Sequence, residues 1–179
     1  DTKMFVAFTQ FSTFNSDSSD GRLVGEFVTY YLEAQTARVG ETRVIMGNKL
    51  GSLYRHPQFI RLKDRILLIF NGAQNEVLVY ESFDECVTFA QKTINTDAFA
   101  YPNGWAMGLD AAVLIERGLY AGRIVLALYT GAWDIGTAYS DDNGATWVNG
   151  TNYKSSDLFP TYPVLNEISV TTDAHGDLI

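Results

Sequence analysis

Short apolar runs recur along the whole chain, and Gly, Asn, Asp and Ser separate them. Runs of about four to eight residues that are rich in Val, Ile, Leu, Phe and Tyr are typical of β-strands. A helix over 32–39 is the one alternative element, and no residue caps it well. The apolar runs are 4–8, 27–31, 59–62, 65–70, 77–80, 112–115, 123–129 and 168–170. This pattern predicts an all-β fold.

The predicted strands also repeat at a constant interval. The segment 82–89, SFDECVTF, aligns with 140–147, SDDNGATW, and the two are 58 residues apart. The same offset places 65–70, RILLIF, on 123–128, RIVLAL. Repeats of roughly this length, each built from four short strands, are typical of the blades of a β-propeller.

The repeat divides the chain into four pieces, which extend approximately over 1–50, 55–95, 110–150 and 165–179. The middle two are predicted to be four-stranded antiparallel blades, with inner strands at 59–62 and 111–116. The first piece is expected to enter at its second strand, and the last to supply only an inner strand and the start of the next. Residues 1–179 are therefore expected to form about three blades, as a segment of a longer protein or as a chain that closes a ring with other copies. The predicted strands that follow the two inner ones are 65–70, 76–82 and 88–90, then 123–129, 135–140 and 146–148.

The segment 140–147 fits the Asp-box pattern S-x-D-x-G-x-T-W. We expect Asp142 to accept hydrogen bonds from the tight turn, Gly144 to supply an unusual backbone angle and Trp147 to pack against the sheet. In the first copy, Cys86 replaces the glycine and Phe89 replaces the tryptophan. Two Asp boxes in one repeat register resemble the sialidase (neuraminidase) superfamily, which implies about six blades in the complete domain.

Two short motifs extend this resemblance. Tyr54-Arg55-His56-Pro57 is similar to the F/Y-R-x-P motif of sialidases, which implies that Arg55 binds the sialic acid carboxylate with its planar guanidinium group. The Asn166-Glu167 pair is similar to the N-E element of the family, in which the glutamate is the partner of a tyrosine nucleophile. The resemblance therefore implies catalysis by Glu167 on a sialylated glycan or polysialic acid.

The repeat adds an argument from position. Arg55, Asp110 and Glu167 each come just before a predicted inner strand, so we expect them to ring one mouth of the central channel. The loop after Phe70 lacks the aspartate and the second arginine that sialidases carry there, so either Asp110 is the acid or the chain has none. That loss also fits the phage endosialidases, which act on polysialic acid.

A purely structural role remains an alternative at each of these positions. Arg55 can instead pair with a neighbouring carboxylate, Glu167 can be a solvated loop residue, and Asp110 can stabilise a turn. Tyr54 and Trp105 are candidates for stacking on a sugar ring, although most aromatic residues of a propeller pack inside its sheets.

The composition of the chain excludes several classes of binding partner. The formal net charge of −8 and the pI near 4.6 argue against a nucleic-acid surface. A single cysteine, Cys86, excludes an intrachain disulfide, and two distant histidines give no metal-ligating pattern, so no metal or cofactor is expected. No apolar stretch is long enough to span a bilayer, and the opening residues 1–4 have neither the basic nor the apolar region of a signal peptide, so none is expected. The resemblance implies an extracellular or virion-surface location.

Two function classes follow from these observations. The first is a glycoside hydrolase that cleaves sialic acid linkages, of which this chain is an incomplete segment. The alternative is a non-catalytic propeller of an adhesin or phage tail, which binds glycans or has a structural role. The expected partners are the sialylated glycan and either the remaining blades or another copy of the chain.

Overall fold

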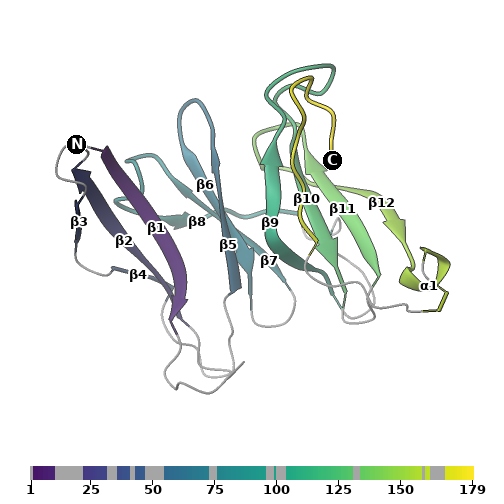
Figure 1. Ribbon diagram of the computed structural model, residues 1–179, viewed down its shortest axis with the longest axis horizontal. Coiled ribbons are helices and arrows are strands. Elements are labelled where there is room, and N and C mark those ends of the chain that lie inside the picture. The colour runs from purple at the N-terminus through teal and green to yellow at the C-terminus, as the bar shows by residue number, and fades with distance from the viewer. Residues whose placement is uncertain are drawn as a thin grey trace.

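The computed structural model describes residues 2–10, 22–31, 36–40, 43–46, 55–72, 76–95, 99, 104–130, 134–158, 160–161 and 168–179. Nearly all regular structure within these ranges is β, which confirms the predicted all-β class (Figure 1). The single α-helix of the described ranges is one turn long. The elements are β1 (Thr2–Gln10), β2 (Arg22–Tyr31), β3 (Thr36–Val39), β4 (Arg43–Met46), β5 (Arg55–Arg61), β6 (Ile66–Asn71), β7 (Val77–Ser82), β8 (Ala90–Gln91), β9 (Ala106–Leu114), β10 (Ile124–Tyr129), β11 (Ile135–Ser140), β12 (Val148–Tyr153) and α1 (Ser155–Leu158).

The described strands form three separate four-stranded sheets, and all pairings within them are antiparallel. We call them sheets A, B and C in chain order. Sheets B and C are simple meanders, β5-β6-β7-β8 and β9-β10-β11-β12. In sheet A, β1 pairs with β2, and the short strands β3 and β4 pair with different parts of β2.

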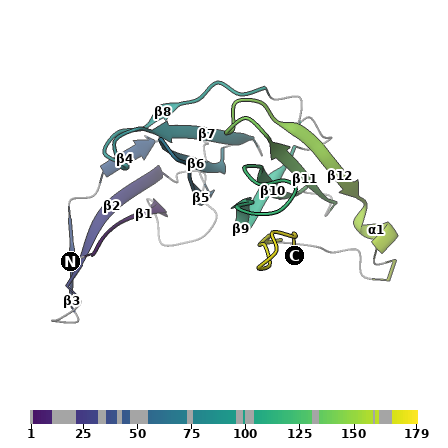
Figure 2. The ribbon, with the colours of Figure 1, turned by 90° about the horizontal axis from the view of Figure 1, so that it is seen from above.

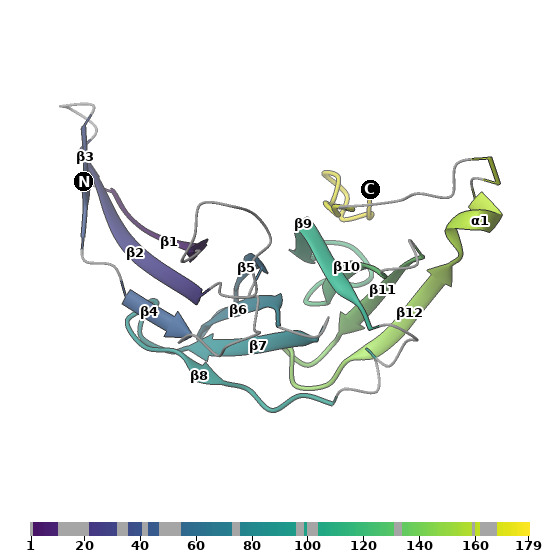
Figure 3. The ribbon, with the colours of Figure 1, turned by 90° about the horizontal axis from the view of Figure 1, so that it is seen from below.

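The three sheets lie side by side along an arc (Figures 2 and 3). The first strand of each sheet lies on the inner side of the arc, where β1 contacts β5 and β5 contacts β9. Across the first of these contacts the Phe5 and Phe59 rings meet edge to face at 5.9 Å. The expectation that the first piece enters at its second strand is therefore wrong, because β1 occupies the same place in sheet A as β5 and β9 do in theirs.

Two apolar clusters hold the sheets together. The larger lies between sheets B and C, where Leu67 and Ile69 of β6 pack with Leu126 and Leu128 of β10, all with 0% exposure. The smaller lies between sheets A and B and includes Leu68, Phe70 and Tyr80 together with Leu23 of β2. Alternate residues of β6 thus face opposite sheets, as the period of a strand that is buried on both faces requires.

The second Asp box forms the loop between β11 and β12. Asp142 Oδ1 accepts hydrogen bonds from the Ser140 hydroxyl and the Thr146 amide, both at 2.8 Å, and Oδ2 accepts the Thr146 hydroxyl at 2.6 Å. The Gly144 amide in turn donates to the Ser140 hydroxyl oxygen. The predicted turn-fastening role of Asp142 and the positive φ of Gly144, +78°, are confirmed.

The first Asp box repeats this network in the loop between β7 and β8. Asp84 accepts the same three hydrogen bonds from Ser82 and Thr88, and the Cys86 amide donates to the Ser82 hydroxyl oxygen at 2.9 Å. Cys86 adopts φ +66°, close to the value at Gly144, although a side chain disfavours the left-handed region. The hydrogen bonds of the box therefore impose the loop conformation even without glycine.

These networks predict a fall in stability below about pH 4. Hydrogen bonds from the Thr88 hydroxyl and amide lower the pKa of Asp84 to about 2, below the value of about 4 in an unfolded chain. A carboxyl group whose pKa is lower in the folded than in the unfolded state stabilises the fold at pH values above the unfolded pKa. This contribution to stability is lost as pH falls from about 4 toward about 2. We expect the thermal midpoint to drop across this window, and to drop less in Asp84→Asn. If the thermal midpoint fell equally with pH in the wild type and in Asp84→Asn, this account would be contradicted.

Two asparagine side chains clamp sheet B to sheet C at opposite edges. Asn71, at the end of β6, accepts the Met107 amide at 2.8 Å and donates to the Met107 carbonyl at 3.0 Å. Asn95, after β8, makes the same pair of bonds with the Trp147 backbone at 2.7 and 2.9 Å. Each asparagine side chain thus hydrogen-bonds as a peptide group of a neighbouring strand would. It satisfies one backbone N–H and one backbone carbonyl of sheet C.

Candidate functional site

A hollow of about 650 Å³ lies where the first strands of sheets B and C meet the C-terminal segment. Its lining residues come from β5, β9 and 168–171, which occupy equivalent positions in the sequence repeat. Apart from one carboxyl group, its polar side chains are an amide and two hydroxyls, the kinds of group that bind sugar hydroxyls. The lining residues are Pro57, Gln58, Phe59, Asp110, Ala112, Val113, Ser169, Val170 and Thr171.

Asp110 contributes that carboxyl group from a β-bulge in β9. The pairing of β9 with β10 shifts register at this point, and Asp110 adopts φ +50° with an exposed side chain. Aspartate tolerates this conformation better than most residues do, and bulges commonly re-aim a side chain beside a site. Asp110 was predicted to precede the strand, whereas β9 begins at Ala106 and carries Asp110 within it.

The C-terminal segment reaches the hollow because β9 has a glycine at the contact. A Cβ atom on Gly108 would lie 2.0 Å from the Ile168 carbonyl oxygen, so a larger residue cannot coexist with this approach. The Val170 amide then donates to the Asp110 carbonyl at 3.0 Å. Residues 171–179 turn back as a small hairpin, in which Thr171 and Ile179 exchange two backbone hydrogen bonds of 3.0 Å.

Arg55 is the first residue of β5, is half-buried and lies opposite Asn71. Gln58 lies opposite Ile69, two residues earlier on β6, so Arg55 is roughly 7 Å nearer the end of the sheet than the hollow. It does not belong to the lining of the hollow. Arg55 pairs with Asn71, and Ala106 pairs with Tyr129, which lies 58 residues after Asn71, so the register matches Arg55 with Ala106 rather than with Asp110.

His56, which sequence reasoning did not select, occupies the bulge of β5 with φ +52°. Its Nδ1 lies 2.6 Å from the Met107 carbonyl oxygen, which can only accept, so Nδ1 carries the proton. Asn71 Nδ2 is 3.2 Å from the same nitrogen and donates to the same carbonyl. The histidine therefore helps to hold β5 against β9 beside the hollow.

Of the three other predicted residues, the structure describes one, Trp105. The structure buries Trp105 completely between sheets B and C, and its ring lies 2.8 Å from the position of a Cβ atom on Gly136. A sugar cannot stack on a ring without an exposed face, so the predicted stacking role of Trp105 is wrong and its role is packing. Tyr54 and Glu167 lie outside the described residues.

Comparison with known proteins supports the fold. No protein-family model matches the sequence, and no curated protein matches it. A crystal structure of a protein of unknown function from Dyadobacter fermentans DSM 18053 is similar over 98% of this chain, with a TM-score of 0.66 and 16% identity. The similar region is 57% of that protein, so this chain spans less than two thirds of its length. At this identity the similarity shows a shared fold.

The described part of the chain contains no apolar helix of membrane-spanning length.

Proposed function

We propose that the three sheets are blades of a sialidase-type β-propeller, and that the hollow beside Asp110 binds a sialylated glycan for hydrolysis. The supporting observation is the pair of Asp boxes, which lie 58 residues apart in neighbouring sheets and share four side-chain hydrogen bonds. The inner strands of these sheets lie side by side, and the hollow opens between them. Ligands commonly bind in such concave sites with a few convergent polar groups.

The proposed chemistry assigns a role to each candidate residue. Asp110 protonates the leaving glycosidic oxygen, Glu167 takes the proton of a tyrosine nucleophile, and Arg55 binds the sialic acid carboxylate near the rim. The exposed carboxyl group of Asp110 at the hollow is the described observation that fits this scheme. The roles of Arg55 and Glu167 rest on the sequence motifs.

A glycan-binding module without hydrolysis is the second candidate. Asp110 is the one ionisable side chain among the described residues that line the hollow. Glycoside hydrolysis needs at least two groups that donate, accept or attack. Binding needs only the hydroxyl and amide groups and an apolar wall.

Asp110→Asn tests the proposal in the protein that contains this chain. Asparagine keeps the left-handed backbone conformation and removes the acid. We expect the rate of release of sialic acid from a natural glycan to fall by about 10²- to 10⁴-fold. The rate of release from an aryl sialoside, whose leaving group needs little protonation, should fall much less. Both rates are measured by quantifying the released sialic acid.

Asp64→Asn is the matched control, because Asp64 is an exposed carboxylate in the turn between β5 and β6. It should leave both rates unchanged. Equal losses on the two substrates in Asp110→Asn would refute the acid role. Saturable binding of sialylated glycan without any hydrolysis would favour the binding module instead.

A further inference from the structure

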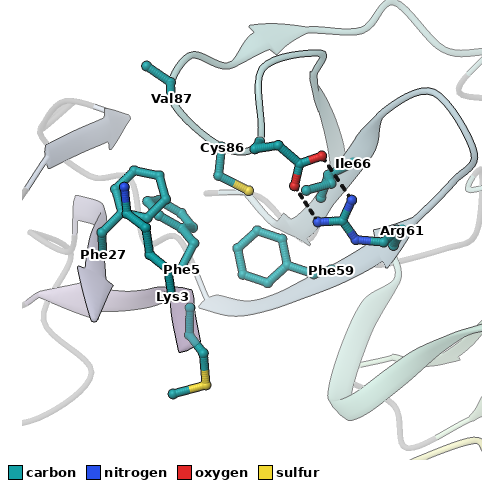
Figure 4. Close-up of a pocket in the computed structure, with 10 residues that line it drawn as sticks. Lys3, Phe5, Phe27, Phe59, Arg61, Ile66, Cys86 and Val87 are labelled. Carbon is teal, nitrogen blue, oxygen red and sulfur yellow. Dashed lines mark hydrogen bonds and ion pairs between the residues drawn. The ribbon is translucent and has the colours of Figure 1, made fainter. Parts of the chain in front are cut away.

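A second hollow, of about 540 Å³, lies between sheets A and B at the level of the first Asp box (Figure 4). Its volume falls in the range of sites for drug-sized ligands, roughly 300–1,000 Å³. It lies between sheets A and B, whereas the Asp110 hollow lies between sheets B and C, and Phe59 lines both. Its lining residues are Lys3, Met4, Phe5, Phe27, Phe59, Arg61, Ile66, Glu85, Cys86 and Val87.

Aromatic rings form one wall of this second hollow. Phe5 lies edge to face with Phe27 at 4.9 Å and with Phe59 at 5.9 Å. Figure 4 shows Cys86 across from these rings. Burial raises the pKa of the Cys86 thiol to about 11, so at neutral pH it presents an uncharged, polarisable surface. These groups suit a flat apolar ring, because aromatic pairs gain from edge-to-face and offset contacts.

The charges of the side chains that line the second hollow do not cancel. Arg61 and Glu85 form a two-point ion pair at one end, drawn as dashed lines in Figure 4, and neutralise each other. The Lys3 ammonium lies 4.3 Å from the centre of the Phe27 ring, and no described carboxylate forms an ion pair with it. The described lining thus carries one uncompensated positive charge, although the chain as a whole has a formal charge of −8.

The aromatic residue that ends the Asp box is smaller at this junction than at the junction of sheets B and C. In the second box, Gly144 fits tightly against sheet B, since a Cβ atom on it would lie 2.9 Å from Leu67 Cδ1. Trp147, at 2% exposure, fills the same junction together with Phe99 at 5.8 Å. At the junction of sheets A and B the smaller Phe89 takes the place of Trp147 and packs on Phe5 at 5.7 Å.

We infer that the hollow between sheets A and B binds a small aromatic anion, in which a ring system carries a carboxylate or sulfonate group. The ring lies against Phe5 and Phe59, and the anionic group faces Lys3. This site shares Phe59 with the proposed glycan site, and the inference does not depend on the proposed hydrolysis.

Two fluorescent probes test this inference. Anilinonaphthalene sulfonate is an aromatic anion, and N-phenylnaphthylamine carries the same rings without the charge. We expect the wild-type chain to bind the anion saturably at one site near neutral pH. Lys3→Gln should weaken binding of the anion by roughly three- to fivefold, the size of a partly exposed ion pair, and leave the neutral probe unchanged. Higher salt should reduce binding of the anion in the wild type but not in Lys3→Gln.

Val87→Trp supplies the second variant, because an indole at this loop position fills the hollow from its edge. It should weaken the binding of both probes at least tenfold. The control is Lys63→Gln, a change at an exposed lysine in the turn between β5 and β6, which should change the binding of neither probe. Thermal unfolding of each variant checks that the fold is retained. Unchanged binding of both probes in Val87→Trp would overturn the site, and an unchanged anion affinity in Lys3→Gln would overturn its preference for anions.

Discussion

Replacing Asn71 by alanine is expected to lower the free energy of unfolding by about 2–4 kcal/mol. Asn71 is buried at 5% exposure and makes two hydrogen bonds to the Met107 backbone. Met107 is itself fully buried, so its amide and carbonyl would both lose a partner where water has little access. Urea unfolding followed by tryptophan fluorescence measures the change.

Asn149→Ala is the control for this prediction, because Asn149 is exposed on β12 and an alanine there should change stability by less than about 0.5 kcal/mol. Asn71→Asp is the informative second variant. Aspartate can still accept the Met107 amide but cannot donate to the Met107 carbonyl, and it buries a charge. It should therefore be at least as destabilising as alanine. A loss below about 1 kcal/mol in both variants would mean that the clamp contributes little.

Gly108→Ala is expected to detach the C-terminal segment from β9, at a cost of about 2–3 kcal/mol. The added methyl group would lie 2.0 Å from the Ile168 carbonyl oxygen, and backbone atoms cannot yield as a flexible side chain can. The hydrogen bond from the Val170 amide to Asp110 should break with it. Hydrogen exchange at the Val170 amide should accelerate by at least tenfold, and the Asp110 hollow would lose one wall.

Gly122→Ala separates steric overlap from backbone strain. Gly122 has φ +94°, and no atom lies within 4 Å of the place that an added methyl group would take, so alanine there meets strain without overlap. It should cost about 1 kcal/mol and leave exchange at Val170 unchanged. If Gly108→Ala and the wild type showed the same exchange at Val170, the close approach of β9 and the C-terminal segment would be refuted.

Local sequence patterns predicted the elements that depend on near neighbours in the chain. The apolar run 65–70 and the alternating segment 135–140 correspond to β6 and β11 almost residue for residue. The bonds of Asp84 and Asp142 reach only two to four residues, so the pattern of the Asp box contains every partner that it needs. The stability loss at low pH follows from the same short-range bonds.

The inner strands were predicted less well. Both were expected to begin about four to five residues too late, at 59 and 111 rather than at Arg55 and Ala106. The reason is a bulge in each strand, which interrupts the two-residue alternation on which the prediction relied. The same bulges shift the register of the inner strands, so that Arg55 corresponds to Ala106 rather than to Asp110.

The amino-acid sequence by itself determined the all-β class, the repeat of 58 residues and the two fastened turns, because periodicity and turn chemistry act within a few residues. Only the tertiary structure decided that Trp105 is buried, that Asn71 reaches Met107, and that β9 and the C-terminal segment enclose a hollow. These depend on contacts between residues 36 or more apart, or on which face of a sheet meets another. No local pattern records such contacts, since they arise from packing of whole sheets.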